Sequence, residues 1–180
     1  MSPLRALLPT VVAVTAVACS RSGPERAAAT PEEQPGYLTA ATLGEQVVLP
    51  TADYLKLARY READVEYGRN LALQCRTCHN LDDSASSPLG PSLYGLFGRR
   101  AGSLGDFSYS PAMQAADFVW TPRALDAWIA APWRFVPGNR MSFVGLTDQD
   151  ARDALIAALL QITEGGTDKD GQDEESEGGA

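Results

Sequence analysis

Cysteine and histidine are scarce in this sequence. Its 180 residues include three cysteines, at positions 19, 75 and 78, and a single histidine, His79. No two of the cysteines are spaced to close a long loop as a structural disulfide would. Basic residues are outnumbered too, and the formal net charge of -8 excludes nucleic acid as an expected partner. Apolar residues make up 44% of the chain, which suffices for one core but not for a membrane-spanning protein.

The N-terminal residues have the composition of a secretory signal. The stretch 6–18 is mostly apolar, is too short to cross a bilayer, and runs through small residues into Cys19. The sequence Ala16-Val17-Ala18-Cys19 resembles a bacterial lipobox, in which the cysteine is lipidated, although Ala16 stands where Leu, Val or Ile is usual. The alternative is ordinary signal cleavage nearby, with Cys19 unmodified.

Composition divides the rest of the chain into a linker, a folded part and a tail. The last 17 residues hold -6 of the net charge of -8, so the part before them is nearly neutral. We expect a signal peptide at 1–18, a lipid-anchored flexible linker at 19–42, a strap segment at 43–60, a folded domain at 61–163 and a disordered acidic tail at 164–180.

The folded domain contains the pattern C-x-x-C-H in Gln74-Cys75-Arg76-Thr77-Cys78-His79, which is typical of covalent attachment of one haem c. Two thiols three residues apart lie on one face of a helical turn, at about the span of two haem vinyl groups, and each would form a thioether. The next residue, His79, would then bind the iron. A redox dithiol would need a βαβ pattern, and a zinc site would need further ligands, and the domain offers neither.

Two methionines could bind the iron on its other side. A second strong-field ligand suits the iron to electron transfer, and methionine raises its potential. Met113 lies in a short helical pattern, where a methionine more often fills a core. Met141 follows Pro137 and Gly138 in a rigid loop, which can hold its side chain toward the iron. We therefore favour Met141.

The hydrophobic pattern predicts an all-α fold with helices at about 64–76, at 111–116, from 121 to just before Pro132, and from 147 to the end of the domain. Asp64, Thr121 and Thr147 are the expected N-caps, with Asp150 completing a loose capping box after Thr147. Gly68 in the first helix would allow the last helix to approach closely.

Over about residues 68–163 the chain resembles the class I c-type cytochromes, and among them the mitochondrial-type branch. The resemblance rests on the haem motif, on 90–99 (GPSLYGLFGR), on 107–110 (FSYS), on Trp120, on 137–141 (PGNRM) and on Phe143. It implies a small class I cytochrome c fold, in which a few helices wrap around one covalently attached haem. The family expectation is that Gly68 and Leu71 pack against Leu155 and Ala158.

The resemblance also implies roles for residues outside the haem motif. The carbonyl of Pro91 would accept a hydrogen bond from His79 and fix the orientation of its ring. A buried haem propionate, which is costly to bury without hydrogen bonds, would be surrounded by Arg99, Tyr109 and Trp120. Without a haem, Tyr109 and Trp120 would be ordinary core aromatics. Trp128 stands where this branch has a tyrosine whose hydroxyl approaches the methionine sulfur, and Met113 stands where it commonly has an asparagine.

The function implied is outer-sphere transfer of single electrons in a respiratory chain. The expected partners are a quinol-oxidising cytochrome complex and a terminal oxidase or reductase. The protein itself is expected in the periplasm, tethered to the membrane through Cys19. Arg76, Arg134 and Arg140 would lie near the haem edge, either to steer a partner or as ordinary solvated surface. The alternatives are a peroxidase-like haem enzyme, if Met141 leaves the iron open, and a fixed cytochrome subunit of a larger oxidoreductase complex.

Overall fold

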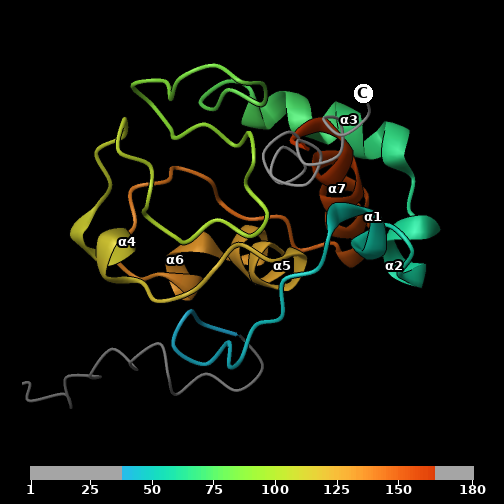
Figure 1. Cartoon of the computed structure of the whole chain (residues 1–180), viewed down its shortest axis with the longest axis horizontal. Coiled ribbons are helices and arrows are strands. Elements are labelled where there is room, and N and C mark those ends of the chain that lie inside the picture. Colours follow the sequence, from blue (N-terminus) through green and yellow to red (C-terminus); the bar gives the residue numbers. More distant parts are fainter. Residues whose placement is uncertain (1–37, 165–180) are drawn as a thin grey trace, which may run out of the picture.

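Two helices from opposite ends of the domain pack directly against each other. The computed structural model describes residues 38–164, and in it α3 (Val65–Cys75) crosses α7 (Gln149–Ile162), as Figure 1 shows. A Cβ atom on Gly68 would lie 1.9 Å from the carbonyl oxygen of Ala154 and 3.0 Å from the Cβ of Ala158. Only glycine permits this approach, so the expected contact between Gly68 and the last helix is confirmed, with Ala154 as its nearest neighbour.

Local capping determines where these two helices begin. The side chain of Asp64 accepts a hydrogen bond of 2.9 Å from the amide of Tyr67, as the sequence predicts for α3. At α7 the N-cap is Asp148, whose carboxylate accepts a hydrogen bond of 2.7 Å from the amide of Ala151. The expected cap at Thr147 is therefore wrong by one residue, because the aspartate next to it provides the acceptor.

Shorter helices close the lower half of the domain in Figure 1. They are α4 (Pro111–Ala115), α5 (Pro122–Ala130) and α6 (Pro132–Phe135). Thr121 caps α5 as predicted, with a hydrogen bond of 3.1 Å from the amide of Ala124, and α5 ends before Pro132. Helix α6 was not predicted from the sequence; it begins at Pro132 because proline suits the first position of a helix. Edge-to-face contacts join the rings of Phe118, Trp120, Trp128 and Phe135.

The strap segment contains two single-turn helices, α1 (Thr51–Tyr54) and α2 (Ala58–Arg61), both in contact with α7. Packing begins earlier than the expected boundary at residue 43, since the amide of Ala40 donates to the carbonyl of Phe135 at 2.9 Å. Leu43 is buried, and the amide group of Gln46 makes two hydrogen bonds, of 2.7 and 2.9 Å, with the main chain of Val119. The strap is thus fastened to the domain along much of its length.

The fold class predicted from the sequence, all-α, is confirmed. Residues 38–164 contain helices and one isolated bridge between Arg100 and Val119, but no strand. In the same stretch no helix has both the length and the apolar character needed to cross a bilayer. The predicted signal peptide at 1–18, Cys19, most of the predicted linker and almost all of the predicted acidic tail lie outside the described residues.

Candidate functional site

A cavity of about 840 Å³ lies between the helices and the loops that connect them. This volume is within the range of about 300–1,000 Å³ that is usual for cofactor sites. The cavity is lined by all nine residues that were assigned to the haem from the sequence, which are Cys75, Cys78, His79, Pro91, Arg99, Tyr109, Trp120, Trp128 and Met141. Residues far apart in the sequence are therefore brought together around one space.

The two cysteines and the histidine of the motif are held on one helical turn at the end of α3. The amides of Cys78 and His79 both donate to the carbonyl of Cys75, at 3.1 and 2.9 Å. The thiols of Cys75 and Cys78 are not joined in a disulfide. Both residues line the cavity, as two thioether bonds to a haem require, so this part of the site fits the group.

The ring of His79 is fixed by two neighbouring residues. Its Nδ1 lies 2.6 Å from the carbonyl oxygen of Pro91, and because a carbonyl can only accept, Nδ1 carries the proton. A Cβ atom on Gly90 would lie 2.7 Å from Cε1 and 2.8 Å from Nδ1 of the ring, so only glycine leaves room for it. Burial lowers the pKa of His79, which favours the neutral imidazole, and Nε2 keeps its lone pair for a metal.

The loop that carries Met141 is braced by the side chain of Asn139. The Nδ2 of Asn139 donates to the carbonyls of Pro132 and Val136, each at 2.9 Å, which ties the loop to α6. Its Oδ1 accepts a hydrogen bond of 2.8 Å from the amide of Met141. The main chain at Met141 is thus held by a side chain whose amide group bonds at both ends.

The second methionine reaches the same cavity from α4. Met113 is 7% exposed and belongs to the apolar core, and its amide donates to the hydroxyl of Ser110 at 3.2 Å. Met141 is only partly buried and packs against that core from outside. Met113 therefore fills the core, as expected from its helical pattern, and also lines the cavity.

The polar side of the cavity is formed by Arg99 and its neighbours. The guanidinium donates to the carbonyls of Tyr94 at 2.8 Å and Ser92 at 2.7 Å, which are neutral partners. Burial lowers the pKa of Arg99 and raises the pKa of Tyr109. A partly buried guanidinium bonded to carbonyls is suited to receive an anionic group such as a carboxylate.

Comparison with known proteins identifies the family. No protein-family model matches the chain, but individual proteins do. A cytochrome c2 of Agrobacterium tumefaciens (strain II Chrys) is 38% identical over 102 residues, which are 55% of this chain and 92% of the relative. A cytochrome c of Stellaria longipes is 36% identical over 105 residues, 58% of this chain and 97% of the relative. A cytochrome c2 of Afifella marina is 39% identical over 110 residues, 59% of this chain and 89% of the relative.

The chain belongs to the cytochrome c family. It is a class I c-type cytochrome with one covalently attached haem c. It acts as a haem electron carrier and is not an enzyme, so the peroxidase-like alternative is not supported. The cavity, with its two thiols, its oriented imidazole and its predominantly apolar wall, fits this cofactor.

Several residues that shape the site of this cytochrome were not singled out from its sequence. Gly90 and Asn139 appeared only as members of the family segments, without roles. Asp106 lines the cavity and accepts hydrogen bonds from the amide of Ser86 at 2.7 Å and from its hydroxyl at 3.0 Å. These bonds lower the pKa of Asp106 and join two loops of the cavity rim. No local pattern marks such a pair, because its members are 20 residues apart.

Of the three arginines expected near the haem edge of the cytochrome, two are already engaged within the domain. Arg134 stacks on the ring of Trp133, with its guanidinium carbon 4.5 Å from the ring centroid. Arg140 lines the cavity and donates to the carbonyl of Ser108, which connects the Met141 loop to the opposite rim. Arg76 is exposed, just after α3.

Proposed function

We propose that this cytochrome carries single electrons between membrane redox complexes outside the cytoplasm, with Cys75 and Cys78 holding the haem and with His79 and Met141 binding its iron. The observation that supports this most directly is the convergence of all four residues on one cavity. The haem supplies the one-electron chemistry, since its iron alternates between the ferrous and ferric states. The protein supplies attachment, orientation and exclusion of water.

The protein alone fixes the orientation and the tautomer of the His79 imidazole. Its Nδ1–H is held by Pro91, so the tautomer with a free Nε2 is favoured, and the hydrogen bond increases the basicity of the ring. The main chain of Gly90 lies directly against the ring. A Cβ atom at this position would collide with it, so the space that the ring occupies exists only because residue 90 is glycine. The orientation of the ring is thus set by its hydrogen bond to Pro91 and by the space that Gly90 leaves.

Two differences between the methionines favour Met141 as the second ligand. Met141 sits on a loop whose main chain is fixed by Asn139, so its position is preserved without a helix's constraints. Met113 is part of the packed core, and moving its side chain to the iron would leave a cavity there. A loop held in this way would keep the Met141 side chain in place with little rearrangement, which suits an electron carrier.

One haem propionate would be received by Arg99, with Tyr109 and Trp120 beside it. The reason is electrostatic, since Arg99 bonds to neutral carbonyls and retains its positive charge for an anion. A carboxylate that is buried without such a partner would be strongly destabilising. Trp128 closes the apolar wall and packs edge-to-face on Trp120, with ring centroids 5.6 Å apart.

The N-terminal signal pattern and the family support a proposal for the location and the partners. The N-terminal signal pattern and its cysteine support a periplasmic protein, tethered to the membrane by a lipid on Cys19. Its partners would be a quinol-oxidising cytochrome complex as donor and a terminal oxidase or reductase as acceptor, in a respiratory chain. Intact mass of the protein extracted from native membranes tests attachment and tether together. We expect residues from Cys19 onward plus one haem plus lipid, whereas a lipid-free mass would contradict the tether.

The ligand assignment is tested by a matched pair of substitutions, Met141→Leu and Met113→Leu, each of which nearly conserves volume. We expect Met141→Leu to abolish the methionine–iron charge-transfer band of the oxidised protein and to lower the midpoint potential, because methionine ligation raises it. Met113→Leu should retain the band. The opposite result, with the band lost only on substitution of Met113, would overturn the assignment.

A further inference from the structure

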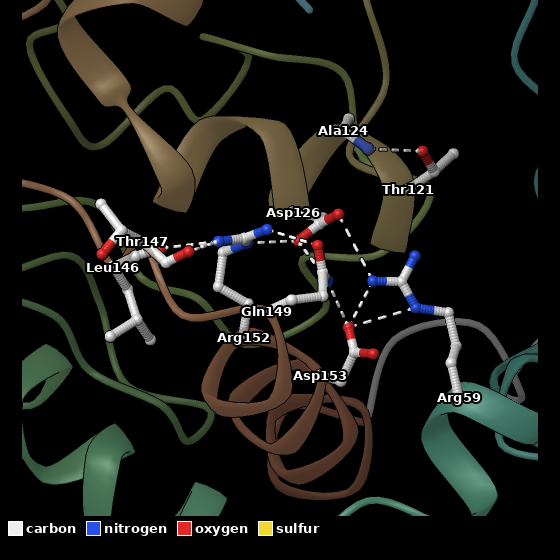
Figure 2. A network of polar contacts seen from close by, with 9 residues as sticks. All are labelled: Arg59, Thr121, Ala124, Asp126, Leu146, Thr147, Gln149, Arg152 and Asp153. Atoms are coloured by element: carbon white, nitrogen blue, oxygen red, sulfur yellow. Dashed lines mark hydrogen bonds and ion pairs between the residues drawn. The ribbon is translucent and has the colours of Figure 1, made fainter. Parts of the chain in front are cut away.

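A polar network joins the end of the Met141 loop to α5, α7 and the strap. Figure 2 shows its centre, Arg152, which is only 9% exposed although it carries a charge. All three guanidinium nitrogens donate. The Nη1 bonds to the carbonyls of Leu146 at 2.9 Å and Thr147 at 2.8 Å, the Nε bonds to Asp126 at 2.6 Å, and the Nη2 bonds to Gln149.

The two carbonyls that Arg152 binds are the last of the loop that begins at Pro137. The amide of Leu146 donates to the carbonyl of Ile129 at 2.7 Å, so the same residue is also fastened to α5. Just before it, Gly145 has φ +105°, and a Cβ atom there would lie 2.5 Å from the carbonyl oxygen of Ala130. The downstream end of the loop is thus pressed against α5 and pinned there from the side of α7.

The guanidinium of Arg152 is itself oriented by Asp126. This carboxylate, on α5, also accepts a bond of 3.3 Å from Arg59 of α2, and Arg59 reaches Asp153 on α7 as well. Two arginines and two aspartates therefore balance one another, which removes the cost of a buried unpaired charge. In Figure 2 the two arginines reach Asp126 from opposite sides, and Arg59 also reaches Asp153, so the strap contributes to the same support.

We infer that Arg152 is a positioning residue for Met141, and that Asp126 keeps it in place. Asn139 fixes the loop to α6 on the N-terminal side of Met141, and Arg152 fixes it to α7 on the C-terminal side. The loop is therefore held at both ends. The inference rests on the proposed ligation by Met141. If Arg152 releases the two carbonyls, the loop opens more often and Met141 leaves the iron more often. A lysine cannot replace it, because one ammonium group cannot reproduce a planar fork that serves two carbonyls and a carboxylate.

A merely structural role would have a different signature. If Arg152 only docked α7 on α5, its loss would lower global stability and leave the local opening of the loop unchanged. The two are separated by the rate at which added imidazole replaces the methionine in the oxidised protein, since that rate reports loop opening.

The test uses the purified full-length holoprotein and the variants Arg152→Lys and Asp126→Asn. The matched control is Arg69→Lys, because Arg69 also bonds to α7, through Gln161 at 2.8 Å, but does not touch the loop. We expect imidazole binding to accelerate about tenfold or more in Arg152→Lys, from the loss of two hydrogen bonds to a charged donor. A smaller acceleration is expected in Asp126→Asn and none in Arg69→Lys. Rates within about twofold of wild type in both test variants would overturn the inference, because a released loop changes this rate by more.

Hydrogen exchange of the Leu146 amide provides a readout that does not depend on the iron. This amide, which donates to the carbonyl of Ile129, should exchange faster in Arg152→Lys when compared with the amides of α7. An unchanged ratio of the exchange rates would overturn the inference. If wild type and Met141→Leu bind imidazole at the same rate, the proposed ligation fails instead. The exchange result then still decides whether Arg152 holds the loop.

Discussion

Replacing Gly90 by alanine should weaken the seating of the His79 ring, and the structure gives the size of the effect. The φ of Gly90 is not in the left-handed region, so alanine meets no backbone penalty there. The penalty comes from contact, because the new Cβ would lie 2.7 Å from Cε1 and 2.8 Å from Nδ1 of the ring, and 2.9 Å from the carbonyl oxygen of Cys78. All three distances are shorter than van der Waals contact.

Relief of this contact requires the ring or the main chain of residue 90 to move, and either movement disturbs the adjoining hydrogen bond of 2.6 Å between the ring and Pro91. Overpacking of a well-packed site costs about 1–3 kcal/mol, and a weakened hydrogen bond adds about 1 kcal/mol. We therefore expect Gly90→Ala to lower the free energy of unfolding of the holoprotein by about 2–4 kcal/mol. The midpoint potential should also shift, since the basicity of the ligand depends on that bond.

The assay is guanidinium unfolding of the holoprotein combined with a potential titration. Gly105→Ala is the matched control, because Gly105 lacks a positive φ and a Cβ added there would meet no atom within 4 Å. Its free energy of unfolding should be unchanged or higher by up to about 1 kcal/mol, through the entropy of the unfolded chain. If Gly90→Ala behaves like Gly105→Ala in both measurements, the steric account of the His79 ring is refuted.

Two further substitutions test the Met141 brace and a buried tyrosine. Asn139→Ala removes two hydrogen bonds to main-chain carbonyls and the acceptor of the Met141 amide. The methionine–iron charge-transfer band of the oxidised protein should therefore disappear at a lower temperature than in wild type. An unchanged temperature would show that Asn139 does not hold the loop. Burial raises the pKa of Tyr60 to about 12, and Tyr60 is 3% exposed. Because the folded protein keeps this proton longer than the unfolded chain, the free energy of unfolding should fall between about pH 10 and 12, by up to about 2.5 kcal/mol. Tyr60→Phe should lack this part of the fall when unfolding is measured across that range.

The parts of this cytochrome that could be predicted from its sequence are those whose information is local. The haem motif is contiguous, and the caps Asp64 and Thr121 bond to amides only three residues away. Helix α7 was predicted one residue early because Thr147 and Asp148 are both good caps, and sequence alone does not decide between neighbours. Helix α6 was missed since four residues are too few to show a period.

The residues assigned to the haem could be named from the sequence, but their supports could not. The nine assigned residues came from the haem motif, from the comparison of the two methionines and from the family resemblance. All nine line one cavity, and their roles stay predictions. The supports depend on contacts between distant residues. Arg152 binds a carboxylate 26 positions away, and Gln46 binds a main chain 73 positions away. The close approach of Gly90 to His79 also depends on a loop path that no periodicity reports.

The contacts that hold the strap to the domain determine where a force applied from the N-terminal side would act on this molecule. Without it, a pull on the N-terminal side would act at the start of α3, the helix that leads directly to the two haem cysteines. Because Ala40 is bonded to Phe135 and Leu43 is buried, the pull acts beside α6 instead, next to the loop that carries Met141. A tether on the N-terminal side would therefore act on the domain at that edge, and not on the helix that leads to the haem cysteines.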